Sequence, residues 1–265
     1  MKKVAIALIV LLACIPAFAQ PAPDKAAILK KATAAYYLLK AHGLSGFQCE
    51  ATPDWDKFIS ETFKGVNPLE ADFGRKLKLL RASVAVSGSD SRTVTPRFSD
   101  GTPIANDFKQ SSDGLAQMIG GFYQTWWSLA FDDPFSDLTT ADSDMRMEGD
   151  NYRFHRKTAD SEETVILTKD YVISRMDIVL PDGAVTVMPT YTKTPKGLLL
   201  QNVESDIAAL KQHVSMSIEY SDVGGFKLPA KATYKVTGPD LDVKLDVTFS
   251  QYKLTTTAYS NFVGG

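Results

Sequence analysis

The residues able to perform acid–base, nucleophilic or metal chemistry are few and scattered along this sequence. The three histidines are His42, His155 and His213, and none has a second ligand at a spacing typical of a metal site. The patterns H-E-x-x-H, G-x-S-x-G and C-x-x-C do not occur, nor does a phosphate-binding glycine loop. We therefore expect no catalytic residue, no metal ligand and no cofactor.

One cysteine, Cys49, lies in the stretch GFQCEAT, which has the character of a short strand. No histidine or lysine flanks it, so nothing nearby in the sequence would lower its pKa and activate the thiol. We expect Cys49 to be buried and chemically inert.

Acidic residues are concentrated in one turn-rich segment, at Asp132, Asp133, Asp137, Asp142 and Asp144. Calcium could bind such a loop, but the EF-hand pattern is absent and solvated acids in a turn are the commoner arrangement. A pair of catalytic carboxylates from distant parts of the chain, as in glycoside hydrolases, also stays open.

The segment MKKVAIALIVLLACIPAFAQ has the pattern of a secretory signal peptide. Lys2 and Lys3 precede an apolar run, which is followed by Pro16 and an A-x-A cleavage site that ends at Ala19. We expect cleavage after Ala19 and a periplasmic or secreted protein. The run LLAC, which ends at Cys14, resembles a lipobox, so a lipoprotein anchored at Cys14 is the alternative.

Charge and length exclude several classes of protein. The chain has 265 residues and a net charge of −2, with both signs interspersed, so it lacks the basic patch of a nucleic-acid-binding protein. After the leader, no segment approaches the ~18 uninterrupted apolar residues of a transmembrane helix. We expect one domain over residues 20–265.

The first half of the chain has mainly helical patterns, in which apolar residues recur every three or four positions. A helix is expected between Asp24 and Gly43, with Ile28, Tyr36 and Leu39 on its apolar side. A strand at 46–52 precedes two helices that form a helical insertion at about 53–81. A hairpin over 82–98 and a long helix over 107–131 follow.

The second half is almost entirely strand. Strands are expected at 145–149, 151–157, 163–168, 171–180, 184–191, 197–204, 213–221, 226–236 and 241–252. The short turns between them imply antiparallel neighbours in a meander. In the last hairpin, a four-residue turn would place Lys235 opposite Asp242 and Lys231 opposite Asp246, with the apolar side chains on the other face.

The long helix carries four aromatic residues, Phe122, Tyr123, Trp126 and Trp127, and its second half is apolar nearly all round. Such a helix should be buried on more than one side. Ordinary core packing is the simpler interpretation. The alternative is a helix that crosses a curved sheet and lines an apolar pocket, with Trp126 and Phe122 against the strands that contain Ile218 and Tyr220.

The strands over about 163–252 resemble the C-terminal strands of bacterial envelope proteins of the LolA/LppX-like class. In that class a strand x-I-E-Y precedes a turn and then G-F-x-L-P-x-K, and the last long strand often ends F-x-x-Y. Here these are Ile218-Glu219-Tyr220, Gly225 to Lys231, and Phe249 to Tyr252. The resemblance implies an α+β fold, in which a curved antiparallel sheet forms an incomplete β-barrel covered by helices, with a hydrophobic cavity for acyl chains.

The function implied by this resemblance is a periplasmic, non-catalytic carrier or sensor of an acyl chain, lipid or lipoprotein, with envelope membrane proteins as further partners and no nucleic acid. The expected ligand-binding residues are Phe122, Trp126, Trp127, Ile218, Tyr220, Phe226, Leu228, Val243 and Leu245. Two alternatives stay open: an envelope scaffold with a filled core, and a hydrolase with an unrecognised pair of acids.

Overall fold

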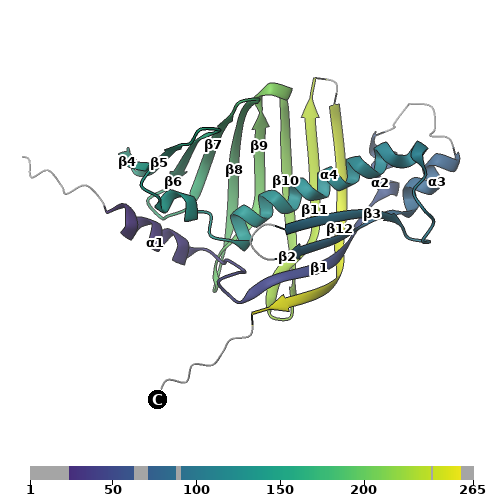
Figure 1. The fold of residues 1–265 in the computed structure, drawn as a ribbon, viewed down its shortest axis with the longest axis horizontal. Coiled ribbons are helices and arrows are strands. Elements are labelled where there is room, and N and C mark those ends of the chain that lie inside the picture. The colour runs from purple at the N-terminus through teal and green to yellow at the C-terminus, as the bar shows by residue number, and fades with distance from the viewer. Residues whose placement is uncertain (1–23, 63–70, 88–90, 240, 258–265) are drawn as a thin grey trace, which may run out of the picture.

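A single sheet of twelve antiparallel strands dominates the computed structural model, which describes residues 24–62, 71–87, 91–239 and 241–257. The strand order is β3-β2-β1-β12-β11-β10-β9-β8-β7-β6-β5-β4, so strands β4 to β12 form a meander (Figure 1). The expected leader with Cys14, part of the helical insertion expected at 53–81 and part of the hairpin expected over 82–98 lie outside the described residues.

The strands agree closely with those expected from the alternation of apolar and polar residues. Their bounds are β1 Leu44–Pro53, β2 Leu80–Ser87, β3 Ser91–Phe98, β4 Ser143–Glu148, β5 Asn151–Lys157, β6 Glu162–Leu167, β7 Ile173–Leu180, β8 Gly183–Thr194, β9 Gly197–Ile207, β10 Gln212–Val223, β11 Phe226–Gly238 and β12 Leu241–Thr256. All nine strands expected after residue 145 are present, and the expected hairpin over 82–98 is the pair β2 and β3.

Helices cover one face of this sheet. The α-helices are α1 Lys25–Ala35, α2 Trp55–Thr62, α3 Ala71–Leu79 and α4 Lys109–Trp126. Short helical turns are η2 Asn106–Phe108, η4 Ser136–Thr139 and η5 Ala208–Leu210, and the π-helical segment η3, Trp127–Phe131, continues α4. The helix expected over 107–131 is therefore present, although its last turn is wider than an α-helical one.

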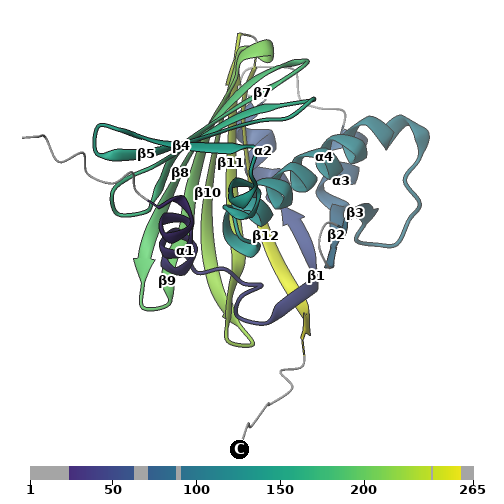
Figure 2. The same cartoon turned by 60° about the vertical axis from the view of Figure 1, so that its left-hand side comes forward.

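The sheet is strongly curved, and α4 crosses its inner face (Figure 2). The apolar side chains of the inner face, of α1 and of α4 form one continuous core cluster. Strands β3 and β4 end the sheet and do not pair with each other within the described chain, so the barrel is incomplete. The fold is α+β with a curved antiparallel sheet covered by helices, as expected.

The first helix is shorter than expected. Its N-cap is Asp24, whose side chain accepts a hydrogen bond from Ala26 N, but the helix ends at Ala35 rather than near Gly43. Tyr36 instead forms a bridge with Leu198 of β9, and its hydroxyl accepts a hydrogen bond of 2.7 Å from Ile173 N. These contacts with residues far away in the sequence hold Tyr36 in an extended conformation outside the helix. The spacing of apolar residues in the sequence could not indicate them.

The register expected for the last hairpin is wrong by two residues. Thr237 faces Asp242 and Lys235 faces Lys244, because Gly238 and Leu241 already pair across a tighter turn. A shift of two residues keeps every side chain on its expected face, since side chains alternate with a period of two. Lys231 still reaches Asp246 diagonally, at 3.1 Å between Nζ and Oδ2.

Candidate functional site

Helix α4 has two faces of different character. Leu115, Ile119 and Trp126 are buried in the core on one face. Gly114 and Gly121 lie on another face, and a Cβ atom added at either glycine would meet no heavy atom within 4 Å. These two glycines are seven residues apart, or about two helical turns, so they share one side of the helix and leave space beside it.

That space is an apolar cavity of about 900 Å³ between α4 and the inner face of β8 to β12, which we call the large chamber. Helix α4 contributes Gly114, Gln117, Met118, Gly121, Phe122 and Thr125, and the strands contribute Val185, Val187, Val203, Ser205, Ile207, Gln212, Val214, Met216, Tyr234, Val236, Leu241 and Val243. None of these residues is Asp, Glu, Lys, Arg or His. The volume lies within the range of about 300–1,000 Å³ that is typical of small-molecule sites.

A second apolar cavity of about 300 Å³, the small chamber, lies between α2, α3, α4 and β12. Its lining residues are Trp55, Phe58, Phe73, Leu77, Ser111, Gly114, Leu115, Met118, Val243 and Leu245. Gly114, Met118 and Val243 line both chambers, so the two cavities adjoin along α4 and β12.

The aromatic residues of α4 pack next to the large chamber. Trp126 is fully buried, and its Nε1 donates a hydrogen bond of 3.2 Å to the hydroxyl of Tyr220 on β10. Phe122 stacks on Phe249, with ring centroids 5.0 Å apart, and meets Tyr234 edge to face at 5.8 Å. Burial raises the pKa of Tyr234 well above its ordinary value, so this tyrosine adds no charge to the chamber. The expected contact between Trp126 and the strand containing Tyr220 is present.

Three of the nine residues expected to bind ligand line a chamber. They are Phe122 in the large chamber, Leu245 in the small chamber and Val243 in both. The other six belong to the surrounding core: Trp126, Trp127, Ile218 and Leu228 are buried in it, and Tyr220 and Phe226 pack against it. Their role in binding stays a prediction.

Most of the wall of the large chamber consists of residues outside the nine that were expected to bind ligand. Val185, Val187, Val203 and Val214 lie on strands that were expected, and their alternation with polar residues could have placed them on the inner face. The pattern could not show which part of that face α4 leaves uncovered. The spacing of Gly114 and Gly121 was the available signal.

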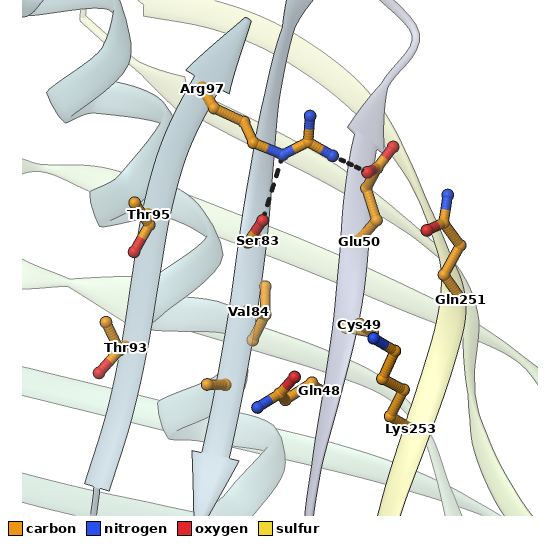
Figure 3. Close-up of a pocket in the computed structure, with 11 residues that line it drawn as sticks. Gln48, Cys49, Glu50, Ser83, Val84, Thr93, Thr95, Arg97, Gln251 and Lys253 are labelled. Carbon is orange, nitrogen blue, oxygen red and sulfur yellow. Dashed lines mark hydrogen bonds and ion pairs between the residues drawn. The ribbon is translucent and has the colours of Figure 1, made fainter. Parts of the chain in front are cut away.

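A separate pocket of about 330 Å³ lies over strands β1, β2, β3 and β12 (Figure 3). Most of its lining residues are polar, and two of its three charged groups pair with each other: Arg97 bonds to Glu50 and also donates a hydrogen bond of 3.2 Å from Nε to Ser83 Oγ. The third charged group is Lys253. Cys49 borders this pocket, but its sulfur bonds to the Tyr123 hydroxyl, 3.3 Å away. Burial raises the pKa of Cys49 to about 11, so this pocket offers no activated nucleophile. Cys49 is buried, as expected.

The aspartates of the acidic segment at 132–144 contact different partners and do not converge on one point. Asp132 pairs with Lys40 at 2.6 Å, Asp137 pairs with Arg156 at 3.0 Å, and Asp133 accepts a hydrogen bond from Thr33 Oγ1. Among the described residues, no group of three His, Cys, Asp or Glu side chains is placed to hold a metal ion.

No helix in the described part of the chain is both long enough and apolar enough to span a membrane.

No protein-family model and no curated protein matches the sequence. The structure is similar to the crystal structure of a LolA superfamily protein from Nitrosomonas europaea, with a TM-score of 0.32 and 11% identity, over 89% of this chain and 96% of that one. Such a distant likeness carries no weight for function, which rests on the chambers.

Proposed function

We propose that the protein is an exported, non-catalytic carrier or sensor that binds an apolar ligand, namely the acyl chain of a lipid or lipoprotein, beneath α4. The observation that carries this proposal is the large chamber, about 900 Å³ in volume and walled by apolar and uncharged residues. A packed core leaves few voids larger than a water molecule, so a space of this size next to apolar walls suits a ligand.

Binding would be driven by removal of the hydrocarbon chain of the ligand from water. Each methylene group removed from water contributes about 0.8 kcal/mol, so a chain of about 14 carbons offers roughly 10 kcal/mol before the losses of entropy on binding. Neither chamber has a carboxylate, a histidine or a lysine in its wall, and burial raises the pKa of Tyr234, the one titratable side chain that lines the large chamber, well above its ordinary value. This supports a carrier or sensor over a hydrolase.

The cellular setting of the proposal follows from the leader sequence. A secretory signal would place the chain in the periplasm or outside the cell. Envelope membrane proteins are the partners that we propose for loading or unloading the ligand.

Binding of an environment-sensitive fluorescent fatty acid to lipid-stripped protein tests this function. We expect saturable binding by the wild type and its loss in Gly121→Phe, whose side chain would enter the large chamber. Gly120→Phe is the matched control, because Gly120 is the next residue of α4, has equally open space at Cβ and does not line either chamber. Thermal unfolding of both variants checks that they fold.

If the stripped wild type shows no saturable binding, the carrier proposal is wrong. A scaffold role in the envelope would then take its place.

A further inference from the structure

We propose that the ligand is a lipid with two hydrocarbon chains and a polar head of zero net charge, with one chain in each chamber. This inference rests on the proposed function and adds the chemical class of the ligand. Its starting point is Gly114, which lines the large chamber, the small chamber and a third, polar pocket of about 690 Å³.

The two chambers are distinct but adjoin. Met118 on α4 and Val243 on β12 line both of them, and Gly114 lies one helical turn before Met118. The small chamber extends toward α2 and α3, where Trp55 and Leu77 line it, whereas the large chamber extends along β8 to β11. Because the chambers lead away from Gly114 in different directions, a molecule that branches near Gly114 fills both, while a single chain fills one.

The polar pocket at the same position suits the head of such a molecule. Its other lining residues are Asn106, Lys109, Gln110, Asp113 and Gln117. Lys109 and Asp113 carry one charge of each sign and form an ion pair at 3.0 Å. The remaining side chains are amides, which both donate and accept hydrogen bonds.

This pocket therefore offers one positive charge, one negative charge and several amide groups to the head. A zwitterionic head can pair with both ions at once. A head with a net negative charge would meet the carboxylate of Asp113 without a second cation in the pocket to compensate it.

The test is displacement of the bound fluorescent fatty acid by short-chain lipids that dissolve as monomers. The probes are dioctanoyl phosphatidylethanolamine, the lyso form with one octanoyl chain, and dioctanoyl phosphatidylglycerol. We expect the two-chain zwitterionic lipid to bind at least about tenfold more tightly than its lyso form, since burial of only two methylene groups already changes affinity about tenfold. We also expect it to bind more tightly than the anionic lipid.

A variant that fills only the small chamber separates the two chains. Ser111 lines the small chamber and not the large one, so Ser111→Phe should reduce the affinity for the two-chain lipid to that for the lyso form and leave the latter unchanged. Ser128→Phe, at an exposed position on the same helical segment, is the control. Thermal unfolding of both variants is measured alongside.

Equal affinity of the wild type for the one-chain and two-chain lipids would overturn the inference, whatever the variants do. Tighter binding of the anionic lipid would overturn the assignment of the head. In either case, saturable binding of the fluorescent fatty acid would leave the proposed function intact. Loss of all binding by the wild type would refute the proposed function itself.

Discussion

Replacement of Asp246 by asparagine should weaken the attachment of α2 to the sheet. Asp246 is 5% exposed, and its Oδ2 lies 2.9 Å from Lys57 Nζ on α2 and 3.1 Å from Lys231 Nζ on β11. Its Oδ1 accepts a hydrogen bond of 2.7 Å from Thr233. Asparagine retains an oxygen for Thr233 but loses the charge that attracts both lysines. Trp55 and Phe58 of α2 line the small chamber, so this contact also holds part of the chamber wall.

The magnitude follows from the pKa of this carboxyl. Burial alone would raise the pKa of Asp246, but hydrogen bonds from Lys57, Thr233 and Lys231 lower it from 3.8 to about 2. A shift of that size corresponds to roughly 2.5 kcal/mol. Lys57 and Lys231 are 38% and 37% exposed, so solvent screens their charges. We therefore expect Asp246→Asn to lower the free energy of unfolding by about 1–2 kcal/mol at pH 7.

The loss should depend on pH with a definite sign. The pKa of Asp246 is lower in the folded than in the unfolded protein, so the ionised carboxylate stabilises the fold fully above about pH 4. This stabilisation disappears as the pH falls through about 2. The difference between wild type and Asp246→Asn should therefore be largest at neutral pH and vanish near pH 2.

Urea unfolding at pH 7 and near pH 2 measures this difference. Asp242→Asn, at an exposed position on the same strand, is the matched control and should change stability little at either pH. Equal stability of Asp246→Asn and wild type at pH 7 would refute the reasoning. So would a deficit that persists unchanged near pH 2.

Three further predictions concern other contacts. Cys49 should react with a thiol reagent at pH 8 far more slowly in the folded than in the urea-unfolded protein, because burial raises its pKa to about 11; equal rates would contradict this. Gly197→Ala should lower the free energy of unfolding by at least about 1–3 kcal/mol, because φ is +123° and a Cβ would lie 2.8 Å from the backbone of Tyr36. Gly225→Ala is the control and should cost less, because φ is also positive there but a Cβ would meet no heavy atom within 4 Å. The pKa of His213 is raised by its hydrogen bond with Asp206 and, to a smaller extent, by that with Glu204, despite burial. His213→Gln should therefore lower the free energy of unfolding below about pH 6.5 and have no effect once the pH has risen through the folded pKa of His213. An NMR titration of His213 checks the direction of the shift.

The strands could be predicted from the sequence because their signals are local. Alternation of apolar and polar residues and the glycine-containing turns located β5 at 151–157 without error. The end of α1 could not be found in this way, because Tyr36 leaves the helix for contacts with Ile173 and with the ring of Tyr191, 5.0 Å away between centroids. Those partners are more than a hundred residues distant in the sequence.

The chambers were harder to predict than the fold. Trp126 and Trp127 were expected in the site because they belong to the aromatic cluster of the long helix. Large side chains fill space, however, and both residues lie in the packed core. The open space lies beside Gly114 and Gly121, where the helix has no side chain. A prediction of the cavity therefore required the position of α4 on the sheet, which depends on contacts from many strands at once.

The pairing of β1 with β12 has a consequence for the order in which the chain folds. Ser45 and Thr255 are joined across this pair by a hydrogen bond between positions 210 residues apart, whereas β4 to β11 each pair with the next strand along the chain. Local hairpins close small loops and form early, while the closing of a very long loop is slow. The meander should therefore form first and the β1–β3 segment should join it last. During synthesis from the N-terminus, β1 can pair with β2 soon after both are made, but its other edge stays without a partner until β12 has been made.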